Sequence, residues 1–537
     1  MKKVQVENQK PKGCGTYLLW GVLIFVVLNL IPMLGNKGKY LSLPILIGII
    51  YVLYRYVIKP ILFDFGYKKI YKGETQNSTN SSSSEMVINK TTTIENPFAG
   101  IFISGGAGSG KSKSLIEPLI KEAGAKNFTG VIYDFKFPEL AQYVNTAYSN
   151  SQVKQYYFNF QDLNRSHKIN PIAPNLMKNE SFAREFAHSI IANLNPSEAS
   201  KPNFFVQSSI SFLTAVFWYL KEKYPSYCTL PHAIAMLVQP RLDVLLYELQ
   251  SVPKAGDIIA PIMTAFESGA NDQLSGVVAT LQDQINKINL REVYYLMSET
   301  NINLELNNTD EKGILVLGND PILSTTYAPI MGLILTSISK QLNRQDKEKS
   351  VFMVDEFPTV YIPNVEQLPA TARSNKVATI LACQDISQIT DKYGREKADT
   401  ILSNLGNQFY GRTPNPQTAK RVSEIFGKAE KEVISYSKSK MSITKGRTHS
   451  TRETDIVKVQ DVAQLPTGSF YTILAEGKQK QGLSEIPMDK NFVKTPIQII
   501  DNVSESDLEN AYNRVRNEVN NVILKEVRDF LDLQKKG

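Results

Sequence analysis

The sequence predicts an α/β fold in which a parallel central sheet carries a phosphate-binding loop (P-loop). We expect an all-α domain to interrupt this nucleotide-binding domain and a two-helix transmembrane hairpin to precede it. Three observations support the prediction: a glycine-rich loop, GGAGSGKS, at residues 105–112; short apolar runs that recur along the chain; and two long apolar stretches near the N-terminus. Runs that are apolar on both faces are typical of parallel strands buried between helices.

The two long apolar stretches, residues 17–34 and 41–58, would each be about 27 Å long as helices, which is enough to cross a bilayer core. A cleaved signal peptide is the alternative for the first stretch, but a second stretch follows it. Basic residues flank the pair on the outside, and only Lys37 and Lys39 lie between the two stretches. The positive-inside rule therefore predicts that both termini are cytoplasmic.

The composition is that of an ordinary globular protein, with 42% hydrophobic and 21% charged residues. A formal net charge of +8 permits a polyanionic partner without requiring one. The three cysteines lie far apart, so they predict neither a disulfide framework nor a metal site. At 537 residues the chain exceeds the size of one hydrophobic core, and we expect several folded units.

Composition and periodicity divide the chain into segments. A stretch rich in Ser, Thr and Asn predicts a linker with a short strand near its end, and a long stretch of helical periodicity predicts the all-α domain. The predicted segments are a transmembrane hairpin at 1–60, a linker at 61–95, a nucleotide-binding domain in two parts at 96–174 and 301–500, an all-α domain at 175–300 and a C-terminal amphipathic helix at 501–537.

Two late segments differ from the rest. The polar and basic residues 428–458 are interpreted as a mobile surface loop or, alternatively, as a loop that faces nucleic acid. The C-terminal segment begins with a helix-cap signal and predicts a helix that packs on its own domain rather than on a partner. Its expected apolar face contains Leu508, Tyr512, Val515, Val519 and Val522.

The glycine-rich loop follows the apolar run AGIFISG and precedes the helical SKSLIEPLIKEA, which is the context that a P-loop requires. Its backbone N–H groups, Lys111 and the helix N-terminus would hold the phosphates of ATP, and the Ser112 hydroxyl would bind Mg²⁺. The predicted nucleotide-binding residues are Gly105, Gly106, Ala107, Gly108, Ser109, Gly110, Lys111 and Ser112.

A second element for the nucleotide is predicted where the apolar run SVFMV ends in Asp355 and Glu356. Parallel sheets bind ligands at this carboxyl edge. Asp355 would contact Mg²⁺, and Glu356 would act as the general base that activates the attacking water. Gln384, at the end of VATILACQ, would sense the γ-phosphate or the water, or alternatively would make a hydrogen bond that ends the strand.

A guanidinium group usually stabilises the transition-state charge of the γ-phosphate. The candidates are Arg373, in the connection before VATILACQ, and then Arg412 and Arg421. The four histidines show no metal-binding or catalytic spacing and are interpreted as structural or surface residues. The predicted catalytic set therefore contains Lys111, Glu356, Gln384 and one of these three arginines, of which Arg373 is named first.

The ordered series of motifs resembles the type IV coupling proteins, the TraG/TraD-like ATPases of conjugation and type IV secretion. The resemblance covers most of the chain, and Phe137-Pro138 departs from it by replacing the usual glycine-containing turn. It rests on the apolar hairpin, GGAGSGKS, IYDFKFPEL, HKINPIA, VDEF, RSNKVATILACQDISQITDKYG, NLGNQFYGRTPNPQTAKRVSEIFGK and LPTGSFYTILAEGK.

The resemblance implies a RecA-like ATPase that assembles as a homo-hexamer, hydrolyses ATP with Mg²⁺ between subunits and drives DNA transfer. It assigns the arginine that reaches into the neighbouring site to Arg373 and the family's glutamine to Gln384. The implied partners are DNA, taken as single-stranded, with a bound relaxase, and the components of a type IV secretion channel. The implied location is the inner membrane of a bacterial cell, with two spans and with both termini and the ATPase domain in the cytoplasm.

Two alternatives stay open at this point. A DNA translocase of the FtsK type shares the motor but carries more membrane spans and a separate C-terminal domain that reads DNA. A membrane docking receptor would bind ATP and recruit a relaxase or a protein substrate without motor activity. Glu356 and Gln384 favour hydrolysis over this receptor. The sequence does not distinguish DNA from protein cargo.

Overall fold

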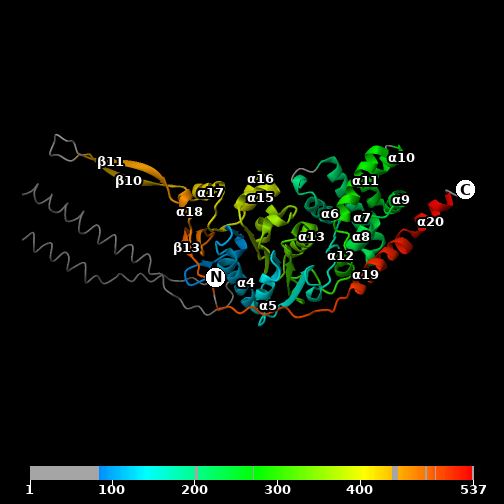
Figure 1. Ribbon diagram of the computed structural model, residues 1–537, viewed down its shortest axis with the longest axis horizontal. Coiled ribbons are helices and arrows are strands. Elements are labelled where there is room, and N and C mark those ends of the chain that lie inside the picture. The colour runs from blue at the N-terminus through cyan, green and yellow to red at the C-terminus, as the bar shows by residue number, and fades with distance from the viewer. Residues whose placement is uncertain are drawn as a thin grey trace, which may run out of the picture. The chain divides into compact units, whose positions relative to one another are not determined.

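The structure is a computed structural model that describes residues 84–199, 203–269, 271–437, 446–477, 480–489 and 491–534. All of them belong to one compact unit, Ser84–Gly537. Figure 1 shows that a central sheet with flanking helices lies next to a group of helices at one end of the described unit.

The central sheet has nine strands and is mostly parallel. Its order is β13 (Gln481–Glu485), β12 (Ser469–Ile473), β9 (Asn407–Tyr410), β3 (Ile101–Ser104), β8 (Val377–Cys383), β7 (Ser350–Val354), β4 (Thr129–Asp134), β6 (Gly313–Gly318) and β5 (Lys154–Asn159). Neighbours from β9 to β5 pair in parallel, whereas β12 pairs antiparallel with both β9 and β13. The predicted α/β fold with a parallel central sheet is confirmed.

Helices cover both faces of this sheet. Successive side chains of a strand point to opposite faces, so Ile103 and Phe102 of β3 enter two different cores. Ile103 packs in the core of α4 (Glu117–Ala125) and α5 (Glu139–Ala147). Phe102 packs in the core of α6 (Glu180–Leu194) and α13 (Ser324–Leu342), which continues into the helical group. Burial on both faces explains why the strands are apolar throughout.

The helical group comes from the chain between β5 and β6. Its helices after α6 are α7 (Phe204–Lys223), α8 (Leu230–Leu237), α9 (Leu242–Gln250), α10 (Pro253–Glu267), α11 (Asn271–Asn286) and α12 (Arg291–Met297). The helices between β7 and β12 are α14 (Leu368–Ala372), α15 (Ile386–Tyr393), α16 (Arg395–Ser403), α17 (Pro416–Phe426) and α18 (Val459–Ala463). Figure 1 shows α7 to α11 together at the end of the unit that lies away from β13.

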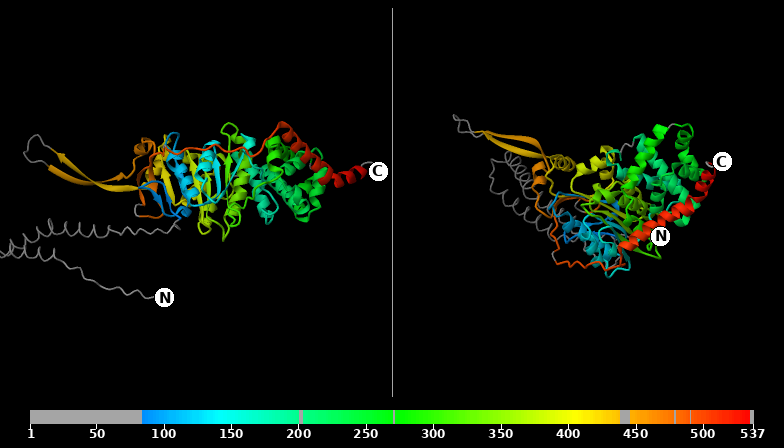
Figure 2. Two further views of the ribbon diagram at one scale, coloured as in Figure 1. Left: turned by 90° about the horizontal axis from the view of Figure 1, so that it is seen from below. Right: turned by 45° about the vertical axis from the view of Figure 1, so that its right-hand side comes forward.

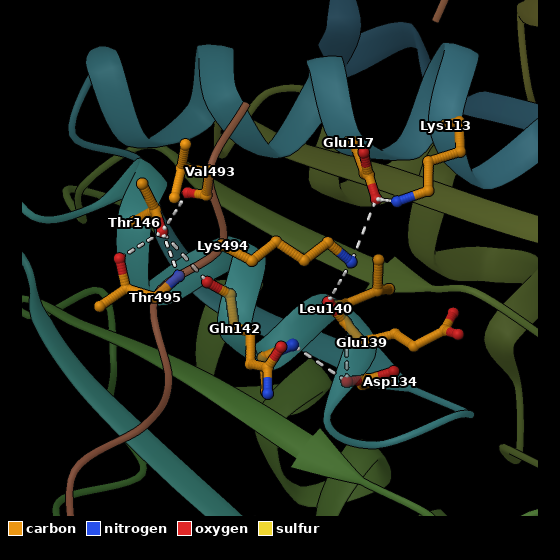
Figure 3. Close-up of polar contacts among 11 residues, drawn as sticks. Lys113, Glu117, Asp134, Glu139, Leu140, Gln142, Thr146, Val493, Lys494 and Thr495 are labelled. Carbon is orange, nitrogen blue, oxygen red and sulfur yellow. Dashed lines mark hydrogen bonds and ion pairs between the residues drawn. The ribbon is translucent and has the colours of Figure 1, made fainter. Parts of the chain in front are cut away.

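An extended segment after β13, residues 491–503, crosses the outer side of α4 and α5, and we call it the strap (Figure 2). The ring of Phe492 stacks on Tyr143 of α5 with 3.8 Å between the ring centroids. Lys494 Nζ donates to the carbonyl oxygen of Glu139 at 3.0 Å and lies 3.4 Å from Oε1 of Glu117, as Figure 3 shows. The strap is therefore fastened to both helices that cover this face.

The far end of the strap reaches the helical group. There the Tyr295 hydroxyl of α12 donates to Asp501 at 2.8 Å. The chain then forms α19 (Glu505–Glu518), a π-helical turn (Val519–Ile523) and α20 (Lys525–Gln534), and α19 packs on α12. The C-terminal segment thus joins the helices beside the P-loop to the all-α part.

The predicted apolar face of the C-terminal helix is correct for four positions and wrong for one. Leu508, Val515 and Val519 are buried and Tyr512 packs against the core, but Val522 is 42% exposed. The π turn, closed by the hydrogen bond from the Leu524 N–H to the Val519 carbonyl, changes the helical phase. Ile523 is buried in place of Val522.

Residues 428–458, expected to form a loop, contain a β-hairpin. β10 (Lys428–Ser437) pairs antiparallel with β11 (Gly446–Asp455) along its whole length, and Figures 1 and 2 show the hairpin extending from the end of the sheet. The two strands carry many Thr and other β-branched residues, which favour pairing over a loop. Contact of this hairpin with nucleic acid stays a prediction.

The described end of the expected linker is ordered. A small antiparallel pair, β1 (Met86–Val87) and β2 (Thr93–Ile94), buries Met86 and Ile94 completely in the core of α4 and α5. The short strand expected there is thus one of a pair. Residues 61–83 lie outside the described residues.

The predicted membrane hairpin, residues 17–34 and 41–58, also lies outside the described residues. In the part of the chain that the structure describes, no helix is both long and apolar enough to cross a membrane. The two longest helices of that part, α7 and α13, instead bury their apolar residues in the protein core. This finding contradicts the predicted location at the inner membrane with two spans, and we withdraw that prediction.

Candidate functional site

The order of the strands brings the predicted motifs together. β3, β8 and β7 are parallel neighbours, so their carboxyl ends meet at one edge of the sheet. The glycine-rich loop follows β3, Gln384 follows β8, and Asp355 and Glu356 follow β7. Ligands bind at this edge in parallel α/β sheets. The glycine-rich loop, which lies more than two hundred residues before the other two motifs in the chain, therefore forms one candidate site with them.

The loop between β3 and its helix has the conformation that a phosphate ligand requires. Gly108 and Gly110 have φ values of 73° and 94°, which favour glycine. A Cβ atom on Gly110 would lie 2.8 Å from the backbone nitrogen of Gly468 and would clash with it. A π-helical turn (Lys111–Ile116) begins directly after Gly110 and continues into α4. The loop thus leads into a helix N-terminus, which attracts phosphate groups.

Lys111 lies at the centre of the candidate site. Its Nζ is 3.1 Å from Oε2 of Glu356 and 3.4 Å from the carbonyl oxygen of Asp355. The Gln384 backbone N–H donates to Oε1 of Glu356 at 3.1 Å, and Nε2 of Gln384 donates to Oε2 at 3.3 Å. The Lys111 and Glu356 side chains are 10% and 8% exposed, so this ion pair is shielded from water. The structure therefore joins three of the four predicted catalytic residues.

Asp355 has the features of a ligand for a hard cation. Its Oδ1 is buried, and within the described residues it has no hydrogen-bond partner. Burial raises the pKa of Asp355 to about 6, although the charge of Lys111 acts in the opposite direction. The half-buried Ser112 follows Lys111 at the start of the helical turn. A carboxylate oxygen without a partner and the hydroxyl that follows Lys111 fit Mg²⁺, which takes few protein ligands and completes its shell with phosphates and water.

The described residues offer no competing metal site, because no cluster of three or more His, Cys, Asp or Glu side chains among them is arranged to hold a metal ion.

Asp134, at the end of β4, is a buried acidic residue with another role. It accepts hydrogen bonds from the backbone N–H groups of Leu140 (2.9 Å) and Ala141 (3.0 Å), as Figure 3 shows in part. Burial raises the pKa of Asp134 to about 7, while those N–H groups oppose the shift. Asp134 therefore holds the first turn of α5.

The three candidate arginines occupy different places. Arg373 comes just before β8, so it lies at the amino edge of the sheet, opposite the P-loop, and its side chain is 57% exposed in an ion pair with Glu476. Arg412 lies against its own P-loop, with Nη2 3.4 Å from the carbonyl oxygen of Gly108. Arg421 pairs with Asp399 at 2.7 Å. Arg373 is thus separated from the site of its own chain.

The segment before β12 supports the P-loop, and the sequence analysis did not identify it. The Thr467 hydroxyl donates to the Gly108 carbonyl at 2.8 Å, and the Gly468 N–H donates to the Ser109 carbonyl at 2.9 Å. On the other side, the Gly106 N–H donates to the Arg412 carbonyl at 2.8 Å. The only signal for this support is the pair Thr467-Gly468 before a predicted strand, which is too common to assign a role.

Asp385 was also missed. It caps α15, accepting from the Ser387 N–H at 2.9 Å, and its carboxylate also accepts from Asn415 (2.9 Å), Thr418 (2.8 Å) and Thr413 (3.1 Å). Burial acts to raise the pKa of Asp385, but these hydrogen bonds outweigh it and lower the pKa. Asp385 fixes the chain next to Gln384. An Asp-x-Ser cap at the start of an expected helix is the signal that could have identified it.

These features define a class of protein: a P-loop nucleotide-binding protein whose parallel sheet presents a lysine, a glutamate and a glutamine at one edge. A family model described as "Type IV secretory system Conjugative DNA transfer" matches residues 67–479. The chain belongs to this family. The resemblance inferred from the sequence motifs is thereby confirmed, together with a function in conjugative DNA transfer.

Solved structures share the fold. The bacterial conjugative coupling protein TrwBdeltaN70, in its unbound form, is 16% identical and has a TM-score of 0.60, and the match covers 78% of this chain and 92% of that chain. The plasmid coupling protein TrwB in complex with ADP and Mg²⁺ is 15% identical with a TM-score of 0.58, and the match covers 75% and 87%. TrwB with the ATP analogue ADPNP is 14% identical with a TM-score of 0.57, and the match covers 76% and 89%. No curated protein matches the chain significantly.

Proposed function

We propose that this chain binds ATP with Mg²⁺ and hydrolyses it to drive DNA, with a bound relaxase, towards a type IV secretion channel. The observation that carries the proposal is the buried contact of Lys111 with Glu356 and of Glu356 with Gln384 at the carboxyl ends of β7 and β8. Nucleotide complexes of TrwB, one with ADP and Mg²⁺ and one with an ATP analogue, support the choice of ligand.

Each residue of the site has its own role in the proposed reaction. The N–H groups of residues 105–112 and the ammonium group of Lys111 bind the phosphates. Asp355 and Ser112 would hold Mg²⁺, which neutralises phosphate charge when it is bound. Glu356 accepts the proton of the attacking water, and Gln384 orients the carboxylate through two hydrogen bonds. Lys111 must exchange Glu356 for phosphate before the carboxylate can take that proton.

The proposal includes a homo-hexameric ring. Arg373 lies at the opposite edge of the sheet from its own P-loop, so it can reach a γ-phosphate only on a neighbouring subunit. It would leave the exposed carboxylate of Glu476 to do so. A ring also gives the transported DNA a central path. Contacts with DNA phosphates displace counterions, and we therefore expect DNA binding to weaken as salt rises.

The test is ATP hydrolysis by the purified full chain, with and without single-stranded DNA and with Glu356→Gln as the control. We expect DNA to stimulate turnover, salt to reduce the stimulation, and Glu356→Gln to abolish it. Tight ATP binding without turnover, in particles shown to be rings, would instead identify a docking receptor. Equal stimulation by DNA and by a relaxase without DNA would show that the cargo is protein.

A further inference from the structure

A pocket of about 560 Å³ opens beside the candidate site and shares two side chains with it, Glu356 and Gln384. Its walls come from the chain after β4 and β7, from the turn after α6 and from α15. They include Phe135, Ser197, Glu356, Gln384, Gln388 and Lys392. Because Glu356 also contacts Lys111, the pocket begins where the γ-phosphate of a bound nucleotide would end.

Three side chains that can donate hydrogen bonds line the pocket one after another. Gln388 and Lys392 are four residues apart on α15, so they lie on one face of the helix, one turn from each other. Gln384 lies just before the helix and is bonded to Glu356. An anion that moves away from Glu356 would therefore pass the amide of Gln384, then the amide of Gln388, and then the ammonium group of Lys392.

The ammonium group of Lys392 has no partner among the residues that the structure describes. Within the described residues it forms no ion pair or hydrogen bond, although its side chain is half-buried. Burial lowers the pKa of Lys392 to about 8, and no neighbouring charge contributes to this shift. Asp391 also lines the pocket, but adjacent residues of a helix point in different directions, and no ion pair joins the two. Partial burial of a cation without a partner is unfavourable, and a bound anion would offset that cost.

Hydrolysis produces such an anion at this place. It breaks the bond from the γ-phosphorus to the bridging oxygen and forms a bond from the γ-phosphorus to the water oxygen, and the water proton passes to Glu356. Inorganic phosphate is then left beside Asp355 and Glu356, and Glu356 repels it once that residue has released the proton and regained its charge. Release of a product is often the slow step of an enzyme.

We propose that this pocket is the exit path of inorganic phosphate and that Lys392, with Gln388, binds the phosphate as it leaves. This inference rests on the proposed function, because the phosphate comes from ATP hydrolysis. It adds a binding site to that function and assigns a role to a face of α15 that the hydrolysis itself does not use.

The experiment compares the full chain with Lys392→Met, Lys392→Arg and, as a matched control, Lys420→Met, whose lysine is 72% exposed beside Glu424. Chemical quench measures ATP cleavage, and a fluorescent phosphate sensor measures the release of phosphate. We expect Lys392→Met to slow release about tenfold relative to cleavage, since a hydrogen bond to a charged group has about this effect. Lys392→Arg should restore release to within about twofold, because it keeps the charge. Lys420→Met should match the wild type.

A direct titration separates this inference from the proposed function. Inorganic phosphate is titrated into the full chain with ADP bound, and we expect Lys392→Met to weaken its binding about tenfold. If the wild type cleaves no ATP, the proposed function fails, and the titration still tests the pocket. Unchanged phosphate binding and release in Lys392→Met, with wild-type thermal unfolding, would overturn the exit path. Loss of DNA binding with unchanged phosphate release would also overturn it, because Lys392 would then contact the DNA backbone.

Discussion

Lys111 and Glu356 form a buried ion pair in which Nζ lies 3.1 Å from Oε2. The pair satisfies both charges in the absence of a nucleotide, since each would be costly if it were buried alone. It also occupies the two groups that the proposed reaction needs for different purposes. Binding of ATP would give Lys111 a phosphate partner and release the carboxylate of Glu356 to the attacking water. Glu356 is therefore unavailable as the general base until ATP binds.

The first prediction concerns this ion pair. Lys111→Met should lower the free energy of unfolding of the nucleotide-free protein by about 3 kcal/mol, because Glu356 is left buried without its cation. Combining it with Glu356→Gln should recover most of that loss, because the double variant has no unpaired charge there. Urea unfolding of both single variants and the double variant measures the effect. Additive losses in the double variant would show that the pair does not act as a unit.

The second prediction concerns pH and magnesium. Burial raises the pKa of Asp355 to about 6, above the value of about 4 in an unfolded chain. This carboxyl therefore stabilises the fold fully below about pH 4, and the contribution is lost as the pH rises to about 6. At pH 7.5 without Mg²⁺, Asp355→Asn should raise the free energy of unfolding by about 1–3 kcal/mol and should have little effect near pH 4.

Urea unfolding in EDTA from pH 4 to pH 8 tests this expectation. Addition of Mg²⁺ and ATP should stabilise the wild type at pH 7.5, because the cation offsets the buried charge, and should stabilise Asp355→Asn less. The interpretation of Asp355 as the ligand would be wrong if both proteins gained the same stability from Mg²⁺ and ATP. Ser112→Ala serves as a second variant, since it removes the other expected ligand without changing a charge.

Much of the site could be predicted because each of its motifs directly follows an apolar run of the sequence. A buried parallel strand fixes both the register and the edge at which its last residue lies, so Lys111, Glu356 and Gln384 could be expected together. The support from Thr467 could not be predicted, because it depends on β12 returning antiparallel beside β9. The exposed Val522 was missed because a single π turn changes the helical phase without a clear sequence signal.

The third prediction tests whether Arg373 acts on a neighbouring subunit. Arg373→Ala should lower turnover by about 10³-fold and leave ATP binding nearly unchanged, because the guanidinium acts only on transition-state charge. Mixing Arg373→Ala with the inactive Glu356→Gln protein should restore part of the activity, since mixed rings contain some intact sites. The comparison variant is Arg412→Ala, whose arginine lies beside its own Gly108 and should weaken ATP binding instead. Absence of recovery in rings shown to be mixed would contradict action in trans.

The fourth prediction concerns the strap, which connects the helices behind the P-loop with the all-α part. Phe492→Ala removes the ring that stacks on Tyr143, and Lys494→Ala removes the contacts with Glu117 and Glu139. Each should speed amide hydrogen exchange in residues 491–503 and in the first turn of α19, because each removes a contact that ties the strap to α4 or α5. Exchange in β3, β7 and β8 should stay unchanged, since these strands are buried independently of the strap.

Val493→Ala is the matched control. Val493 is 76% exposed, and its carbonyl oxygen, which the substitution keeps, accepts a hydrogen bond from Thr146. Equal effects of Phe492→Ala and Val493→Ala would show that the ring does not fasten the strap. If Phe492→Ala also lowers ATP turnover stimulated by DNA while basal turnover is kept, the strap carries coupling between the nucleotide site and the all-α part.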